Sequence, residues 1–396
     1  MRRLSLITVV FFVVGLFSAT LFAANTLELV IPLPLTGKQS KFGEIMKRSY
    51  EMAAEEINVS GGIKKRRLIL TFEDSGAKPE ITRAIVERLI DVNKQPIILG
   101  EYTSACAKAV AAVAEERKTP YLVVQGADDS ITQQNYRYVF RQSAVNNHYG
   151  DGVVSFLKTV VKPRTIAILY ESSAFGTSGA EAMVKDAEKI GAKVVLKEKY
   201  QDGSVDFKPL LSKVKVAHAD VIYMVSYVMD ASLLMKQIQE LRIDAKLFCG
   251  GAAGFAIPEF LENAQNASEY VVSATLWTPQ VKYPGAQEYA EKYKKITGKY
   301  PSYQGANAYA ALYVVKNALE RAKDWTPDKI RDALKATNMM TAFGPIKFED
   351  REGYQNQNFM ETFVIQVQNG RFETIWPEKH ASKKYVFPIP TWRERR

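Results

Sequence analysis

The sequence predicts an α/β protein that contains two doubly wound parallel sheets. Short apolar runs alternate with amphipathic helical patterns over most of its 396 residues. Such alternation is typical of right-handed β-α-β crossovers, which cover both faces of a parallel sheet with helices. The apolar runs are too numerous for one open sheet, so we expect two lobes.

The first β-α unit shows the pattern most clearly. An apolar run at residues 29–31 ends in a loop that contains Pro and Gly. A helical pattern follows, whose apolar face is formed by Met46, Tyr50, Ala53, Ala54 and Ile57. Turn-forming residues at 58–62 then end the helix.

The same rhythm continues along the chain. After the first unit we expect strands at 68–72, 96–99, 121–124, 165–170, 193–198, 221–225 and 246–249. The helices expected after it are 79–93, 104–116, 147–160, 176–190, 207–216, 232–241, 283–297 and 302–322.

The first 24 residues have the layout of a secretory signal peptide. Arg2 and Arg3 form a basic start, residues 4–22 are apolar apart from Ser, Thr and Gly, and Ala23 and Ala24 offer small residues for cleavage. We therefore expect a cleaved signal and an exported, soluble protein. An uncleaved anchor is the alternative, since about 19 apolar residues can just span a bilayer.

The charge of the chain does not indicate a nucleic-acid partner. The formal net charge is +10, and loss of Arg2 and Arg3 leaves +8 because residues 1–24 contain no acid. Lys and Arg are spread among nearly as many acids, and the only basic concentration is the tail at 379–396. We interpret this as a solvated surface and expect no nucleic acid.

The sequence offers no argument for an enzyme, a metal site or a cofactor. Its three histidines, His148, His218 and His380, have no ligand spacing between them. The patterns HExxH, CxxC, GxSxG, GxGxxG and GxxxxGK(S/T) do not occur.

The opening unit resembles the periplasmic leucine/isoleucine/valine-binding proteins of ABC importers. That family has an apolar strand, a Pro-x-x-Gly loop, an aromatic-Gly pair, a helix and an E-I-N-x-x-G-G-I ending. Here the pair is Phe42-Gly43 and the ending is Glu56–Ile63. The segments RYVFRQS (137–143), VVSATLWT (271–278) and FGPIKFE (343–349) resemble the family's three crossings between lobes.

The resemblance implies the type I periplasmic binding protein fold, with two lobes and a three-crossing hinge. Residues 1–24 would be the signal peptide, 25–141 plus 275–350 lobe 1, and 142–274 plus 351–396 lobe 2. Cys106 and Cys249 would then lie in different lobes, so we expect two free, buried thiols. Family members often have a disulfide within the first lobe, where Cys106 has no partner.

The loop after strand 96–99 is the first candidate for a ligand site. Open α/β sheets bind ligands at the carboxyl ends of their strands. Thr103 or Ser104 is placed to cap the next helix, and such an N-terminus can hold an anion, although a plain cap is the alternative. The resemblance implies that this loop holds a ligand carboxylate, with Tyr102 and Ser104 in contact.

The resemblance implies further site residues in both lobes. Gln125, Gly126 and Ala127 correspond to the family's second ligand loop. Phe42 corresponds to an aromatic that closes the pocket from lobe 1. Phe175 and Tyr227 correspond to an aromatic wall on lobe 2.

Two positions depart from the amino-acid-binding members of the family. Ala127 and Ala252 stand where those proteins have a Thr or Ser and an acidic residue that hold the ligand ammonium. A buried ammonium without an acceptor costs on the order of several kcal/mol. Either Asp230, Glu101 or Asp128 substitutes, or the ligand is an aromatic or aliphatic carboxylate without an α-ammonium.

The expected function is that of a non-enzymatic periplasmic receptor. It would capture a small carboxylate-bearing ligand, which is a branched-chain or other amino acid or an aromatic or aliphatic carboxylate. We expect a monomer that closes on this ligand and delivers it to an ABC permease in the inner membrane. The alternative is a ligand-sensing regulatory protein of the same fold.

Overall fold

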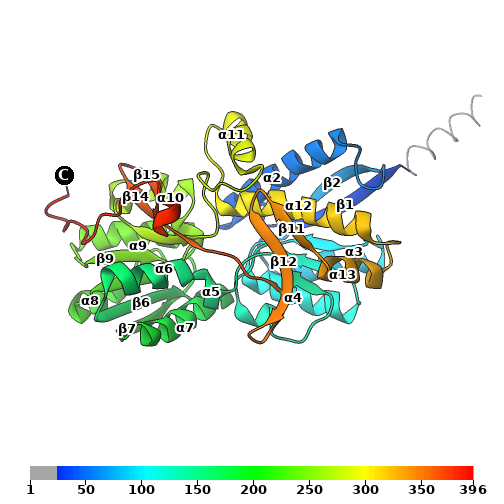
Figure 1. The fold of residues 1–396 in the computed structure, drawn as a ribbon. Coiled ribbons are helices and arrows are strands. Elements are labelled where there is room, and N and C mark those ends of the chain that lie inside the picture. The colour runs from blue at the N-terminus through cyan, green and yellow to red at the C-terminus, as the bar shows by residue number, and fades with distance from the viewer. Residues whose placement is uncertain (1–24, 396) are drawn as a thin grey trace, which may run out of the picture.

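The computed structural model describes residues 25–395, which form two lobes that lie side by side (Figure 1). The expected signal peptide, residues 1–24, lies outside the described residues. Each lobe has a sheet with helices on both faces, as the alternation of elements predicts. Within residues 25–395, no helix combines the length and the apolar character needed to cross a bilayer.

The sheet of lobe 1 consists of a strand pair and a six-stranded sheet. The parallel pair is β1 (Thr26–Leu33) and β2 (Arg67–Asp74). The six-stranded order is β11 (Asn338–Thr341), β12 (Gly344–Arg351), β13 (Tyr354–Asn358), β5 (Val139–Arg141), β4 (Tyr121–Val123) and β3 (Ile98–Gly100). The side-chain amide of Gln95 connects the two parts, because it accepts from the Val30 N–H at 2.8 Å and donates to the Val30 carbonyl at 3.2 Å.

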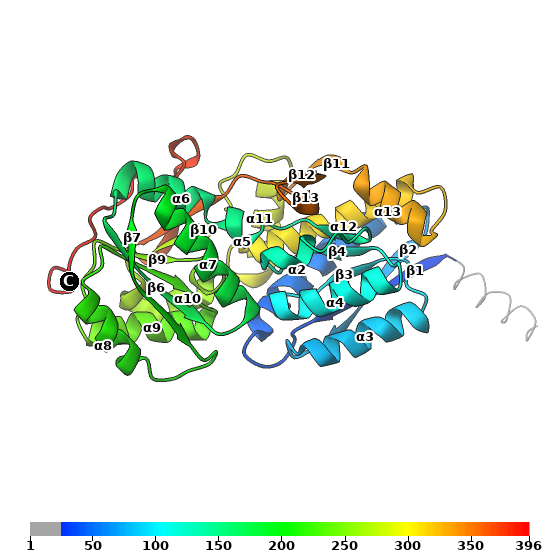
Figure 2. The same ribbon diagram turned by 90° about the horizontal axis from the view of Figure 1, so that it is seen from below.

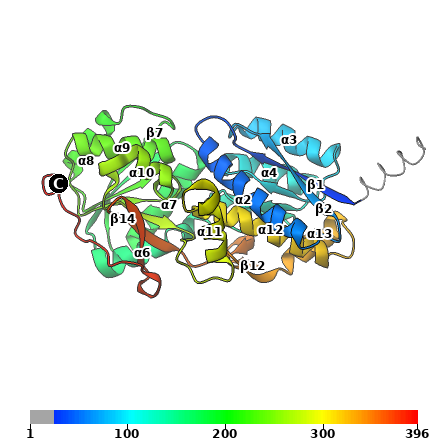
Figure 3. The same cartoon turned by 90° about the horizontal axis from the view of Figure 1, so that it is seen from above.

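Helices cover both faces of this sheet (Figures 2 and 3). One face carries α2 (Ser40–Val59) and α12 (Tyr303–Arg321), and the other carries α3 (Pro79–Asp91) and α4 (Ser104–Glu116). Residues of β1 alternate between the two cores: Leu29 and Ile31 belong to the main core, and Val30 packs with α3 and α4. Helices α11 (Ala286–Thr297) and α13 (Pro327–Lys335) complete the lobe.

Lobe 2 contains a seven-stranded sheet. Its strands, in spatial order, are β15 (Arg371–Trp376), β14 (Phe363–Gln368), β10 (Val272–Thr275), β9 (Leu247–Gly250), β8 (Val221–Val225), β6 (Thr165–Glu171) and β7 (Lys193–Tyr200). The five strands from β10 to β7 are parallel, whereas β14 and β15 are antiparallel to their neighbours. The covering helices are α7 (Ala174–Lys189), α8 (Lys208–Ala217), α9 (Val228–Glu240) and α10 (Pro258–Ala264).

The helical segment predicted at 147–160 is present, but it is not one regular α-helix. It consists of α5 (Asn146–Tyr149), α6 (Asp151–Phe156) and a π turn at Leu157–Val161. Gly152 lies in close contact with Thr362: its N–H donates to the Thr362 hydroxyl at 2.8 Å, and an added Cβ would lie 2.8 Å from the Thr362 carbonyl oxygen. The segment between β13 and β14 thus packs directly on the start of α6.

The boundary expected after residue 350 also differs from the observed pairing. Strand β13 pairs with β12 and with β5, so residues 354–358 extend the sheet of lobe 1. The chain enters lobe 2 only after Asn358. The sequence pattern did not indicate β13, α10 or α13, because each is short and follows a turn. Cys106 in α4 and Cys249 in β9 are buried and free, and they belong to different lobes.

Candidate functional site

Four helix N-termini meet where the two lobes face each other. In lobe 1, α2 leaves β1 in one direction and α4 leaves β3 in the other, so the strand order reverses between β1 and β3. In lobe 2 the order reverses between β6 and β8, which lead into α7 and α9. Ligands of open α/β sheets bind at such reversal points. The fold therefore places one binding edge of each lobe in the same interlobe space.

The α4 N-terminus is built by two adjacent hydroxyl residues with different roles. Thr103 is the helix cap, and its hydroxyl oxygen accepts from the Cys106 N–H at 3.3 Å. The Ser104 hydroxyl oxygen accepts from the N–H groups of Ala127 at 3.1 Å and Asp128 at 3.2 Å. Both lone pairs of Ser104 are therefore in use, and what it can offer a ligand is its proton. A carboxylate oxygen is a suitable acceptor for it.

Aromatic rings from both lobes pack against one another across the cleft. Phe42 of α2 stacks on Tyr102, with ring centroids 4.1 Å apart. Tyr227 of lobe 2 lies 6.3 Å from Phe42, 6.0 Å from Tyr102 and 5.3 Å from Phe175. Tyr149 and Tyr303 make a second interlobe contact, edge to face at 5.9 Å. The lobes thus meet through aromatic surface, which favours a ring or a branched apolar group between them.

The two aromatic-Gly pairs have the same structural basis. A Cβ added to Gly43 would lie 2.0 Å from the Pro34 carbonyl oxygen, and one added to Gly176 would lie 2.0 Å from the Glu171 carbonyl oxygen. Only glycine lets each helix begin this close to the strand end that precedes it. The close approach sets the position of Phe42 and Phe175 at the interlobe face.

A small cavity lies between the lobes. It is lined by Tyr102, Ser104, Gln125, Gly126, Ala127, Ser143, Tyr149, Phe175, Tyr227, Ala253 and Tyr303. Its accessible volume is about 20 Å³, which is room for about one water molecule. A ligand of several heavy atoms enters only if the lobes separate or the rings move. The conformation is therefore closed and tightly packed.

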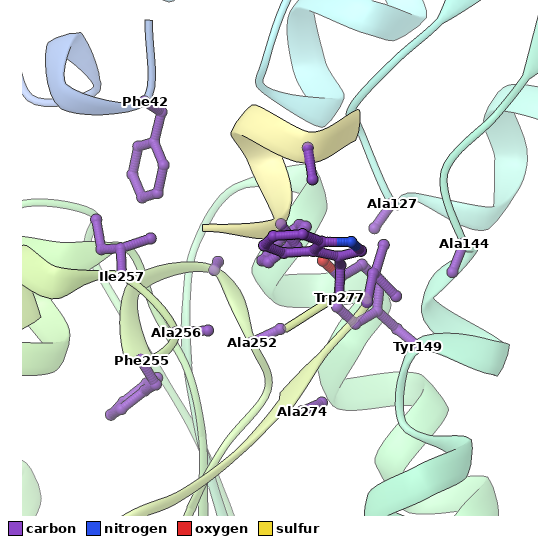
Figure 4. Close-up of a cluster of buried hydrophobic side chains, with 14 of the residues drawn as sticks. Phe42, Ala127, Ala144, Tyr149, Ala252, Phe255, Ala256, Ile257, Ala274 and Trp277 are labelled. Atoms are coloured by element: carbon purple, nitrogen blue, oxygen red, sulfur yellow. The ribbon is translucent and has the colours of Figure 1, made fainter. Parts of the chain in front are cut away.

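Seven of the eleven site residues expected from the sequence line this cavity. They are Tyr102, Ser104, Gln125, Gly126, Ala127, Phe175 and Tyr227. Phe42 lies behind Tyr102, Thr103 serves as the helix cap, and Asp230 and Ala252 lie outside the lining. Figure 4 shows that Phe42, Ala127 and Ala252 come from three different segments around a common cluster of buried side chains.

Four lining residues were not predicted from the sequence: Ser143, Tyr149, Ala253 and Tyr303. Ser143 ends the first crossing, Tyr149 follows it in α5, and Tyr303 begins α12. Their position next to a crossing or at a helix start is the signal that could have identified them. The Tyr149 hydroxyl is buried and makes no hydrogen bond within residues 25–395, so it can accept or donate to a polar group of a ligand.

The three acids expected as possible ammonium acceptors are engaged elsewhere. Asp230 accepts from the Gly203 N–H at 3.1 Å, and burial raises its pKa to about 6. Glu101 accepts from the Tyr102 N–H at 3.1 Å and from the Thr82 hydroxyl at 3.3 Å, and burial raises its pKa to about 7. Asp128 accepts from the N–H of Ser130 at 2.8 Å. None of the three is among the described residues that line the cavity.

The lobe 2 loop at Ala252 has a backbone that disfavours a larger side chain. Ala252 and Ala253 have φ values of +64° and +44°, in the left-handed region that non-glycine residues rarely occupy. Ala253 turns toward the cavity, while Ala252 is 1% exposed beside Phe255 and Ala256 (Figure 4). The lining at this point is a methyl group.

Comparison with known proteins agrees with this architecture. The family model described as "Periplasmic binding protein" matches residues 27–371. The chain is 28% identical over 392 residues to the Leu/Ile/Val-binding protein homolog 8 of Brucella melitensis, which covers 93% of this chain and 96% of that protein.

Solved structures share the fold. The leucine-binding protein LivK of Thermotoga maritima superposes with a TM-score of 0.82 at 24% identity, covering 88% of this chain and 98% of that one. LivJ of Streptococcus pneumoniae, in complex with isoleucine, gives 0.79 at 20% identity over 89% and 100% of the two chains. A solute-binding protein of an R. palustris ABC transporter, in complex with benzoate, gives 0.78 at 16% identity over 88% and 95%.

These likenesses confirm the predicted fold class, two doubly wound lobes joined by three crossings. The resemblance that the opening motif indicated is also confirmed, since the match extends over residues 27–371. The chain belongs to the periplasmic binding protein family.

Proposed function

We propose that this protein is the periplasmic receptor of an ABC importer and binds a small aromatic or branched carboxylate without requiring an α-amino group. The observation that carries the proposal is the composition of the cavity lining: hydroxyl groups, one amide, small residues and aromatic rings. The Ser104 proton suits a carboxylate, and the rings of Tyr102, Phe175 and Tyr227 suit an apolar body. The nearby acids bind backbone N–H groups instead of facing the cavity.

The comparisons support a periplasmic receptor of an ABC importer, and a neighbour solved with benzoate supports a carboxylate without an amino group. Relatives named for branched-chain amino acids and a neighbour solved with isoleucine favour the rival ligand, an amino acid. Export through a cleaved signal peptide and delivery to a permease belong to the proposal, and they follow from the family and from residues 1–24. Such a receptor acts as a monomer that presents its closed form to the membrane complex.

The mechanism is differential binding. Each lobe carries part of the lining, so a ligand contacts all of it only in the closed form and shifts the equilibrium toward closure. The rival function, a ligand sensor of the same fold, uses the same closure but a different partner. Genes for a permease and an ATPase beside this one would favour the importer.

The ligand is tested with matched pairs in calorimetric titrations. L-Isoleucine, its des-amino analogue 3-methylpentanoate, and benzoate are titrated against the wild type and Asp230→Ala. We expect a carboxylate without an amino group to bind at least as tightly as isoleucine, and Asp230→Ala to leave this order unchanged. If isoleucine binds about tenfold tighter and Asp230→Ala removes that advantage, Asp230 is the ammonium site and the proposal is wrong.

A further inference from the structure

Arg141 is a buried cation directly behind the ligand loop. It ends β5, at the first crossing, and its exposed fraction is 0%. Its guanidinium makes four hydrogen bonds, to the carbonyl oxygens of Gly126 at 3.0 Å and Asp128 at 2.7 Å, to the Thr132 hydroxyl at 2.5 Å and to the Gln357 amide oxygen at 2.7 Å. All four acceptors are neutral.

The neighbouring acids do not form an ion pair with Arg141. Asp128 accepts from the N–H and hydroxyl of Ser130 and lies 3.5 Å from Lys108. Asp129 accepts from the hydroxyls of Ser178 and Tyr354. Burial lowers the pKa of Arg141 to about 10, so it remains protonated at neutral pH. Asp129 and Asp128 favour the charged form of Arg141 without touching it. A buried cation that has no direct ion pair within the described residues is costly unless its charge is compensated further.

A short chain of hydrogen bonds leads from Arg141 to the cavity. The Gly126 carbonyl that accepts from the guanidinium belongs to the same peptide group as the Ala127 N–H, which donates to the Ser104 hydroxyl oxygen at 3.1 Å. Hydrogen bonds in series polarise one another, so a cation at one end strengthens donation at the other. The far end is the Ser104 proton at the cavity wall.

We propose that Arg141 is the positioning residue that supplies the positive charge of the carboxylate site, acting through the Gly126–Ala127 peptide and Ser104. It thereby sets the preference for an anionic ligand over a neutral one of the same shape. This inference rests on the carboxylate part of the proposed function and not on the absence of an amino group. A carboxylate in the cavity would add to the partial compensation that Asp129 and Asp128 give this buried charge without direct contact.

The test compares ligands that differ only in charge at the binding group. Benzoate and benzamide form one pair, and L-isoleucine and L-isoleucinamide form the other. In the pair whose carboxylate the wild type binds, we expect Arg141→Met to lower the affinity for the carboxylate by about tenfold or more. The affinity for the matching amide should fall by less than about threefold. Arg141→Lys keeps the positive charge but loses the planar guanidinium with its several donors. Its carboxylate-to-amide affinity ratio should therefore lie between those of Arg141→Met and the wild type.

Thr132→Val is the matched control. It removes one acceptor of the guanidinium but leaves the charge and the path to Ser104, so the carboxylate-to-amide ratio should stay at the wild-type value. In the Ser104→Ala background, Arg141→Met should weaken the carboxylate by only about threefold or less, because the path is already broken. If Arg141→Met does not fold, Gln357→Glu places a carboxylate against the guanidinium and should lower the same ratio.

The outcomes separate the two proposals. If isoleucine binds tightly and benzoate weakly, the proposal of a ligand without an amino group is wrong. The pair of isoleucine and isoleucinamide then still tests the role of Arg141. Equal losses of affinity for the acid and the amide in the Arg141 variants overturn the inference. Arg141 would then only stabilise the structure of the loop. A wild type that binds neither carboxylate overturns both.

Discussion

Ser104 and Thr103 are adjacent hydroxyl residues, but only Ser104 faces the cavity. Its oxygen already accepts from two N–H groups, so the hydroxyl is free to donate a hydrogen bond to a ligand. We expect Ser104→Ala to weaken a bound carboxylate by roughly 1–3 kcal/mol, because a charged acceptor loses one bond and the loop loses an anchor. Calorimetric titration measures the change.

Thr103→Val is the natural control for Ser104→Ala. It deletes the helix cap and should cost about 1 kcal/mol of unfolding free energy while ligand affinity changes little. Equal affinity of Ser104→Ala and the wild type would show that the carboxylate lies elsewhere in the cavity.

Glu101 gives a prediction for pH dependence. It is 0% exposed, and its pKa rises from 4.5 to about 7 on burial. The folded protein therefore holds this proton where the unfolded chain has lost it, so the group's contribution to stability falls as pH rises from about 4.5 to about 7. Glu101→Gln is uncharged throughout. Its stability relative to the wild type should increase between pH 5 and pH 8.

Urea unfolding at the two pH values checks this expectation. Glu80→Gln, at an exposed acid of α3, provides the comparison for a carboxyl outside the core. A Glu101→Gln difference that stays constant with pH would mean that the carboxyl remains charged in the folded protein.

At the scale of elements, the sequence alone predicted most helices and strands. The observed α4 and β8 have the predicted bounds, 104–116 and 221–225, because each combines a clear period with clear end signals. The helix predicted at 147–160 is interrupted, and there the backbone contacts Thr362, between β13 and β14, which no local pattern encodes. The prediction also missed β13, whose partner β5 lies more than 200 positions earlier.

The site was predictable only in part, for a related reason. The loops after β3 and β4 follow from the rule that ligands lie at carboxyl ends of strands, and the resemblance indicated the aromatic positions. Tyr149 and Tyr303 reach the cavity through contact between the lobes, which no local pattern encodes. The sequence does not identify Arg141 as a site residue, because it does not distinguish a buried arginine from an exposed one.

Two loops meet across the mouth of the cleft. Lys38, between β1 and α2, lies 3.8 Å from the Asp202 carboxylate and donates to the Asp202 carbonyl at 3.4 Å. Both side chains are partly exposed, so the pair is worth about 0–1 kcal/mol, and only in the closed form. We expect Lys38→Ala to weaken ligand binding by about two- to fivefold and the loss to shrink at high salt.

Lys316→Ala is the matched control for this pair. Lys316 binds Glu320 at 2.6 Å within α12 of lobe 1, so its removal leaves the contact between the two loops in place. A similar loss for Lys38→Ala and Lys316→Ala would assign the effect to general surface charge instead of closure.

For the whole molecule, the decisive property is the balance between open and closed forms. The closed cavity has room for about one water, so the proposed ligand, of about the size of benzoate, enters only if the lobes separate or the rings move. If the lobes separate in solution, ligand must compensate the cost of bringing them together. We expect small-angle scattering to give a larger radius of gyration for the ligand-free protein than for the protein with saturating ligand.

Tyr227 is one of the rings that connect the lobes, since it contacts Phe42 and Tyr102 of lobe 1 and Phe175 of its own lobe. Tyr227→Ala should keep the ligand-free protein open and require more ligand to reach the compact form. Tyr170→Ala, which removes an aromatic contact with Lys197 inside lobe 2, should leave the scattering unchanged. If the wild type without ligand is already as compact as with it, closure precedes binding, and ligand must enter by movement of the rings alone.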